Sequence, residues 1–189
     1  MPPSIPPGCS IAPGPDALSV RHISEVQPQP PEQQWLVEQL WLASGVGILG
    51  GAPKVCKTYL AAELSLAVAT GAQALGRFAA PLSGPVLFYG DEDSQPALRT
   101  RFQGLAAVRG ADISQMPLYL IDTPVLRLDR HDHLGRLRNS IEHYQPRLLV
   151  LDPFVRLTSI DENSAAEVSG ELASLRTLQR QYDLAVLVV

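Results

Sequence analysis

The sequence predicts a three-layer α/β/α domain whose sheet is mostly parallel. From residue 47 onward, apolar runs of strand length alternate with segments of helical periodicity, as expected for a parallel sheet covered by helices on both faces. Several of these runs hold four or more consecutive apolar residues, which suits strands buried on both sides. Acidic residues follow two of the runs directly. Ligands bind at the carboxyl ends of strands in open α/β sheets, so we expect a site there.

The composition sets the class of protein. With 189 residues, 46% of them hydrophobic and 18% charged, the chain is long enough for one α/β core and a tail. The formal charge of −4 gives no net basic field, which argues against a dedicated nucleic-acid surface unless it is local or built by oligomerisation. Cys9 and Cys56 form no disulfide framework, so a cytoplasmic location is expected. The sequence contains neither a segment of the secretory type nor an apolar run of about 18 residues, so neither export nor a membrane-spanning segment is expected.

The first 31 residues differ from the rest of the chain. They hold nine of the 17 prolines and show neither helical nor strand periodicity, which predicts a disordered or polyproline-like leader. A ligand for a proline-recognition module is the alternative. The domain is therefore expected to span residues 32–189. It opens with an apolar lead-in that contains Trp35 and Trp41, which we expect to be packing residues, although an aromatic side chain at this point is also able to flank a nucleotide base.

Residues 47–58 predict a phosphate-binding loop of the Walker A type between the first strand and the first helix. Gly51 opens the pattern Gly-x-x-x-x-Gly-Lys-Thr, and Lys57 and Thr58 close it. Backbone N–H groups and the helix N-terminus surround the phosphates in this pattern, lysine meets the β/γ oxygens, and the hydroxyl binds Mg²⁺. Cys56 stands where the second glycine belongs, and its side chain takes space that the backbone needs. The residues expected to contact the nucleotide are Gly51, Ala52, Pro53, Lys54, Val55, Cys56, Lys57, Thr58 and Tyr59.

The lysine content supports this interpretation. The chain has only two lysines, Lys54 and Lys57, and both lie in the loop. Leu60, Leu64 and Val68 then follow at helical spacing, so the loop opens a helix.

A second strand is predicted at residues 85–90, and it ends in an acidic turn. Ser94 is suited to cap the next helix, with Pro96 in its first turn. We interpret Asp91 and Asp93 as residues that solvate the turn and favour the helix N-terminus. Glu92, between them, is a candidate site residue.

The remaining elements follow the same alternation. Residues 118–121 predict a third strand, 132–144 a helix ended by Pro146, and 147–152 a fourth strand that leads to Asp152, about 95 residues beyond the loop. An acid in that place is typical of the Walker B position, which holds Mg²⁺. His131 and His133 lie near a helix start, but their spacing is weak support for a metal site.

A last helix is predicted to begin at residues 161–164, and the apolar run 184–189 predicts a buried strand. Because chain termini normally lie at the surface, we expect the chain to be truncated at its C-terminus and to leave an open sheet edge at residues 184–189.

With the loop, Glu92 and Asp152 together, the sequence resembles the RecA-like ATPases of the RepA type, the hexameric replicative-helicase relatives of plasmids and mobile elements. The resemblance runs from about Trp35 to Val189 and rests on the loop Gly-Gly-Ala-Pro-Lys-Val-Cys-Lys-Thr, on Val-Leu-Phe-Tyr-Gly-Asp-Glu-Asp-Ser and on Leu-Leu-Val-Leu-Asp-Pro-Phe. It implies a RecA-like P-loop core, ATP and Mg²⁺ as ligands, a general-base role for Glu92, phosphate contacts for Lys57, and Mg²⁺ contacts for Thr58 and Asp152.

Two hypotheses on function remain. In the first, the domain hydrolyses ATP and, assembled in a ring, couples hydrolysis to movement on DNA in a helicase-like role in replication. In the second, it is a non-catalytic nucleotide-binding remnant or a module that depends on a partner chain. Arg99, Arg101, Arg127 and Arg156 are all available as a transition-state arginine, and the sequence does not choose among them.

Overall fold

The structure is a computed structural model that describes residues 18–157 and 165–189. The first 17 residues of the predicted leader lie outside this part, as does the expected start of the last helix at residues 161–164. Between residue 18 and residue 30 the chain is exposed and has one short 3-10 turn, Ile23–Glu25.

Five parallel strands form the main sheet, in the order β3-β7-β6-β4-β5. The strands are β3 (Gly45–Ile48), β4 (Val86–Gly90), β5 (Leu118–Leu120), β6 (Leu148–Asp152) and β7 (Ala185–Val188). The helices are α1 (Lys57–Thr70), α2 (Gln95–Val108), α3 (His131–Tyr144) and α4 (Ala165–Tyr182), with further 3-10 turns at Pro31–Gln33, Ile113–Gln115 and Phe154–Arg156.

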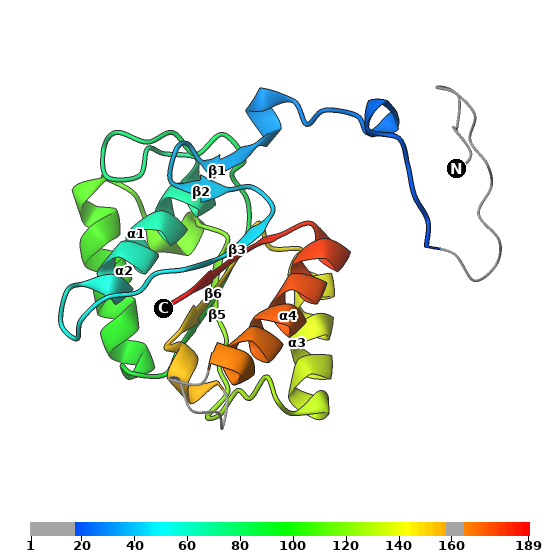
Figure 1. Cartoon of the computed structure of the whole chain (residues 1–189). Helices are drawn as coiled ribbons and strands as arrows, with labels where there is room; N and C mark the ends of the chain where they lie inside the picture. The colour runs from blue at the N-terminus through cyan, green and yellow to red at the C-terminus, as the bar shows by residue number, and fades with distance from the viewer. Residues whose placement is uncertain (1–17, 158–164) are drawn as a thin grey trace, which may run out of the picture.

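The sheet lies between two helical layers. Figure 1 shows α1 and α2 on one face and α3 and α4 on the other. Successive strand residues face opposite layers: Phe88 and Val150 pack in the core beneath α1 and α2, whereas Leu87 and Leu149 pack in the core beneath α3 and α4. Strands buried on both faces need continuous apolar runs, which the sequence supplies. The predicted three-layer RecA-like P-loop core is confirmed.

The position of the last strand corrects one expectation. We expected residues 184–189 to form an open edge, but β7 lies inside the sheet, paired with β3 on one side and with β6 on the other. All four of its residues are fully buried. A parallel strand is placed by the crossover helix before it, and α4 returns the chain to a gap between two earlier strands. The edges of the sheet are β3 and β5.

The apolar lead-in forms a small antiparallel ladder, β1 (Trp35–Val37) with β2 (Trp41–Leu42), which the sequence did not indicate. The Trp41 ring lies against Gly47 of β3 so closely that a Cβ added there would meet it at 2.5 Å. Trp41 is therefore a packing residue, as expected, and Gly47 leaves room for its ring.

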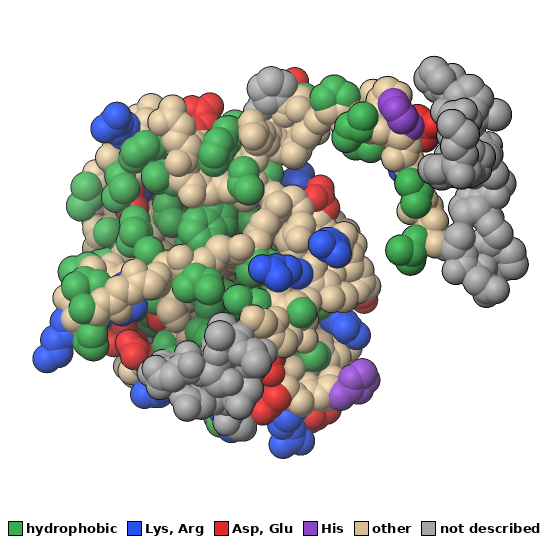
Figure 2. Space-filling view, viewed as in Figure 1, with side chains coloured by type: hydrophobic (Ala, Val, Ile, Leu, Met, Phe, Trp, Pro, Cys, Tyr) green, Lys and Arg blue, Asp and Glu red, His purple; other side chains and the backbone are tan. Residues whose placement is uncertain are grey.

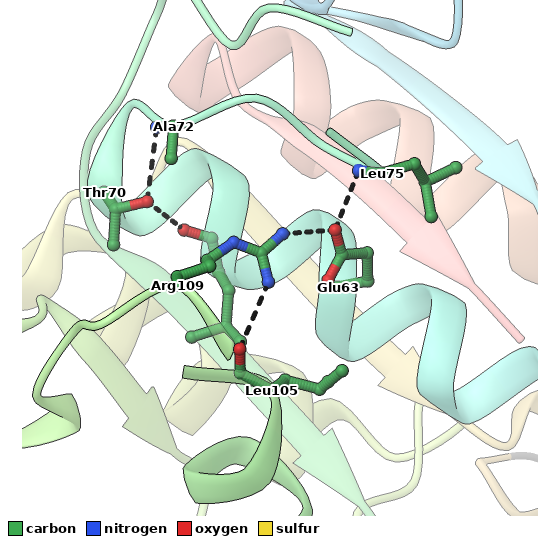
Figure 3. A network of polar contacts seen from close by, with 7 residues as sticks. Glu63, Thr70, Ala72, Leu75, Leu105 and Arg109 are labelled. Atoms are coloured by element: carbon green, nitrogen blue, oxygen red, sulfur yellow. Dashed lines mark hydrogen bonds and ion pairs between the residues drawn. The ribbon is translucent and has the colours of Figure 1, made fainter. Parts of the chain in front are cut away.

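A polar network fixes α1 against the end of α2 (Figure 3). The Glu63 carboxylate accepts a hydrogen bond from the Arg109 guanidinium and another, 2.7 Å long, from the Leu75 N–H. Burial raises the pKa of Glu63, but the bonds from Arg109 and Leu75 outweigh it, and the pKa is lowered overall. The ion pair is needed because α1 is buried continuously from Ala61 to Ala69, not along a single stripe, so the one acid in that segment requires a partner.

Candidate functional site

The predicted phosphate loop joins β3 to α1 and is open to solvent. Residues 51–56 are exposed, and α1 begins at Lys57, so the free N–H groups of its first turn lie beside the loop. Gly51 is sterically restricted, because an added Cβ would meet the Val55 side chain at 3.2 Å. The local geometry is that of an anion-binding helix start.

Lys57 folds back over its own loop. Its ammonium donates hydrogen bonds to the carbonyl oxygens of Gly51 at 3.0 Å and Ala52 at 3.1 Å. These two acceptors hold the charge above the turn, where the oxygens of a phosphate group are able to take their place.

The backbone at Cys56 adopts a conformation that favours glycine. Cys56 has φ 62° and ψ 27°, in the left-handed region, and it caps α1 without a side-chain hydrogen bond. Lys54 is also left-handed, with φ 65°. This conformation is routine for glycine and unfavourable for most other residues. The loop therefore adopts at Cys56 a shape suited to the residue that the pattern expects.

Asp152 lies at the carboxyl end of β6 and is only 2% exposed. Burial raises the pKa of its carboxyl, a hydrogen bond with the Thr58 hydroxyl lowers it, and the negative charge of Glu92 raises it again, with a raised pKa as the net result. Asp152 is thus close to both predicted partners, Thr58 from the start of α1 and Glu92 from the turn after β4.

The pairing of β4 with β6 explains this convergence. Gly90 is the register partner of Asp152, and the Asp91 N–H donates to the Asp152 carbonyl at 2.9 Å. Parallel strands end on the same side of a sheet, so the acidic turn and the buried acid share one edge. Glu92 itself is exposed, which leaves its carboxylate open to a ligand and to water.

The expectation for Asp91 and Asp93 was incomplete, because both acids are in ion pairs. Asp93 binds Arg101 of α2 at 2.6 Å, and Asp91 accepts from Arg156 at 3.4 Å through its carboxylate and at 2.7 Å through its carbonyl. Charge pairs between a turn and a distant segment leave little trace in a sequence. The one available signal was the eight-residue spacing from Asp93 to Arg101, about two helical turns.

Arg101 adjoins the candidate site, and sequence reasoning did not single it out from the four arginines that it considered. Its guanidinium stacks over the Tyr59 ring, 4.4 Å from the centroid, and its positive charge lowers the pKa of Asp152. It therefore connects the first turn of α1, the acidic turn and the end of β6. Among the other arginines considered, Arg99 lies on an exposed part of α2, and Arg127 donates to the Arg156 carbonyl at 3.4 Å.

The donor set fits Mg²⁺ bound together with a phosphate. Mg²⁺ in such sites takes one or two protein oxygens and completes its shell with phosphates and water. Thr58 and Asp152 supply such oxygens, and a buried carboxylate with a raised pKa gains from a neighbouring cation. Within residues 18–157 and 165–189, no group of three or more His, Cys, Asp or Glu side chains is arranged to hold a metal ion. His133 accepts a hydrogen bond from the Arg127 N–H at 3.0 Å, so the idea of a histidine metal site gains no support.

Comparison with known proteins agrees with this geometry. A family model described as "AAA domain" matches residues 15–189. No match was found among curated proteins. In the part of the chain that the structure describes, no helix is both long enough and apolar enough to cross a bilayer.

Proposed function

We propose, because the chain belongs to the AAA domain family, that the loop at residues 51–58 binds ATP with Mg²⁺ and that the acidic edge beside it hydrolyses the γ-phosphate. Membership makes the chain a nucleotide-binding, ATPase-like domain. The observation that carries the finer proposal is the convergence of Thr58, Glu92 and the buried Asp152 at one sheet edge beside Lys57.

Each residue has a defined role in this proposal. Lys57 exchanges its two loop carbonyls for phosphate oxygens, and the N–H groups at the start of α1 bind the same phosphates. Thr58 and Asp152 would hold Mg²⁺, which would supply positive charge to the phosphates. Glu92 orients the attacking water and accepts its proton. Exposure of Glu92 allows water to reach it, and Arg101 holds the neighbouring Asp93 in place.

The two lysines provide a matched test. Lys57→Ala should abolish measurable ATP binding in titration calorimetry, whereas Lys54→Ala, three residues earlier in the same loop, should leave binding within about threefold of the parent chain. Lys54 makes no hydrogen bond to the loop carbonyls that Lys57 holds. Equal losses in the two variants, or none in either, would argue against the loop as the phosphate site.

The alternative of a nucleotide-binding module without turnover rests on Cys56, which places a side chain at the left-handed position where the pattern has glycine. We expect binding to be retained more fully than hydrolysis, because hydrolysis also needs extra positive charge at the transferring phosphoryl group, and the lack of a transition-state arginine there would alone lower the rate by ~10³ to 10⁵. Affinity and steady-state turnover should be measured on one preparation of known oligomeric state. A monomer that turns over ATP at about 1 s⁻¹ or faster would contradict this expectation.

Assembly into a ring and action on DNA, as in RepA-type helicases of replication, are the finer parts of the proposal and rest on the sequence resemblance. We also propose a cytoplasmic location, because the two cysteines form no disulfide framework. The composition of the sequence supports a leader at residues 1–31, rich in proline, and a domain at residues 32–189. An open apolar edge at residues 184–189 would favour aggregation over ordered assembly, but β7 is covered on both sides and presents no such edge.

A further inference from the structure

The acidic turn after β4 places Glu92 at the surface, and the residue before it, Asp91, is bound to the end of β6 and to the turn that follows. The Asp91 N–H donates to the Asp152 carbonyl at 2.9 Å, and the Asp91 carbonyl accepts from the Arg156 guanidinium at 2.7 Å. Figure 2 shows acidic side chains, with basic ones near them, at the surface on the side of the domain where the strands end. The peptide group that leads into Glu92 is therefore fixed against the segment that carries Asp152.

The bond from Arg156 to the Asp91 carbonyl is the stronger of its two contacts with this residue. Arg156 also approaches the Asp91 carboxylate, but at 3.4 Å, with 53% of the arginine side chain and 29% of the aspartate side chain exposed. Exposed ion pairs of this kind contribute little to stability. The 2.7 Å bond has an ionised donor, which makes a hydrogen bond shorter and stronger than one between neutral groups. Its acceptor is backbone, so no rotatable side-chain bond separates the contact from the turn.

The chain around Arg156 is itself held in place. The Phe154 N–H donates to the Val189 carbonyl at 2.7 Å, which ties the 3-10 turn Phe154–Arg156 to the residue after β7. Leu157 is fully buried, and its carbonyl accepts from the Leu128 N–H at 2.7 Å. The backbone on each side of Arg156 is thus anchored to a different segment, so its guanidinium reaches the acidic turn from a fixed base.

We propose that Arg156 is a positioning residue, whose bond to the Asp91 carbonyl holds the acidic turn against the end of β6 and so fixes the position of Glu92. The proposal rests on the role of Glu92 in the proposed function. Arg101 holds Asp93, on the other side of Glu92, at 2.6 Å. Glu92 then lies between two held neighbours, and a misplacement of about 1 Å at a reacting centre costs up to about 10²-fold in rate. Arg156 has this role already in the nucleotide-free chain, whereas a transition-state arginine acts only on bound nucleotide.

Hydrogen exchange on the full, nucleotide-free chain tests the contact without turnover. The Asp91 amide is protected by its bond to the Asp152 carbonyl, and this bond should open more often when the turn loses Arg156. Arg156→Ala should therefore speed exchange at Asp91 by about fivefold or more and leave the interior of β4 unchanged. Arg156→Lys should stay within about twofold of the parent, because both contacts of Arg156 use the single nitrogen Nη1, which an ammonium group is able to replace.

Arg130→Ala is the matched control. The Arg130 side chain is 61% exposed and binds Asp132 at 3.1 Å at the start of α3, so this variant also removes an exposed arginine from an ion pair. It should leave exchange at Asp91 and turnover at the values of the parent. Both arginine side chains are more than half exposed, so neither substitution opens a cavity in the core. A loss in Arg130→Ala as large as that in Arg156→Ala would overturn the proposal.

Steady-state kinetics with Mg-ATP test the consequence for Glu92. Arg156→Ala should lower kcat by about tenfold or more and leave the KM for ATP within about threefold, and Arg156→Lys should restore most of the loss. Asp91→Ala removes the carboxylate but keeps the carbonyl, so it should lower kcat by no more than about threefold.

Glu92→Gln separates this proposal from the function on which it rests. If Glu92→Gln leaves kcat unchanged, the proposed role of Glu92 fails, and the positioning role fails with it. If Glu92→Gln lowers kcat and Arg156→Ala does not, the positioning role alone fails. A lower kcat in Arg156→Ala with unchanged exchange at Asp91 would show that Arg156 acts on the nucleotide instead and would overturn the proposal. In a parent without measurable turnover, exchange at Asp91 alone decides whether Arg156 holds the turn.

Discussion

Replacing Cys56 with glycine tests the interpretation of the loop most directly. Cys56 holds φ 62°, and the left-handed region costs a residue with a side chain roughly 1–2 kcal/mol. Glycine removes this cost but loses about 0.5–1 kcal/mol through its freer unfolded chain. The net gain in the free energy of unfolding should therefore lie between about 0 and 1.5 kcal/mol, and its midpoint of about 0.75 kcal/mol raises the Tm of a domain of this size by roughly 1.5–3 °C.

Nucleotide affinity should also change, for a different reason. If the Cys56 side chain stands where phosphate approaches the backbone, Cys56→Gly should tighten ATP binding by at least about threefold, ~0.65 kcal/mol. Two controls separate the effect of backbone strain at Cys56 from the effect of its side chain on the approach of phosphate. Cys56→Ala keeps the left-handed strain and removes only the thiol. Gln145→Gly relieves a similar strain, at φ 45° after α3, far from the loop.

Differential scanning fluorimetry and titration calorimetry with Mg-ATP measure both effects. We expect Gln145→Gly to raise the Tm without changing the Kd, and Cys56→Gly to improve both. A Cys56→Gly chain that melts lower than the parent would refute the strain argument. One that binds ATP no better than Cys56→Ala would show that close backbone approach is not the limiting factor.

Three further predictions concern groups around the site. Asp152→Asn should raise the Tm of the nucleotide-free chain at pH 7, by about 2–4 °C for each kcal/mol of burial cost relieved, and should abolish the stabilisation by Mg-ATP. The folded-state pKa of Asp152 is raised above 3.8, so the cost of burying its charge grows as pH rises from 3.8 through the folded-state pKa. The difference in Tm between variant and parent should therefore be smaller at pH 4 than at pH 7. Glu63→Gln should lower the free energy of unfolding by about 1–3 kcal/mol in urea titrations at pH 7. The folded-state pKa of Glu63 is lowered below 4.5, so its contribution to stability is complete above pH 4.5 and disappears as pH falls through the lowered pKa. A difference in stability from the parent that is unchanged at pH 3 would contradict the role of the ion pair with Arg109. Arg101→Ala should reduce kcat far more than it raises the KM for ATP, because it releases Asp93 beside Glu92. Arg99→Ala, two residues away on an exposed part of α2, should change neither kcat nor KM. Equal effects of the two substitutions would exclude a positioning role for Arg101.

Much of the candidate site could be proposed from the sequence because its signals are local. A phosphate loop requires a glycine, a lysine and a hydroxyl residue at fixed spacing, and Gly51, Lys57 and Thr58 provide them within eight residues. Buried parallel strands require continuous apolar runs, so the runs that end at Gly90 and Asp152 indicated both the fold class and the edge at which Glu92 and Asp152 converge.

Only the tertiary structure decided which distant segments meet. An apolar run is equally compatible with an edge strand and a central one, so the interior place of β7 followed from the return of the chain through α4. The pairing of Asp93 with Arg101, the stacking of Arg101 on Tyr59 and the left-handed backbone at Cys56 also depend on neighbours or torsion angles that residue types do not specify. Residue chemistry and spacing determine what a segment is able to form, whereas burial and charge pairing depend on what packs against it.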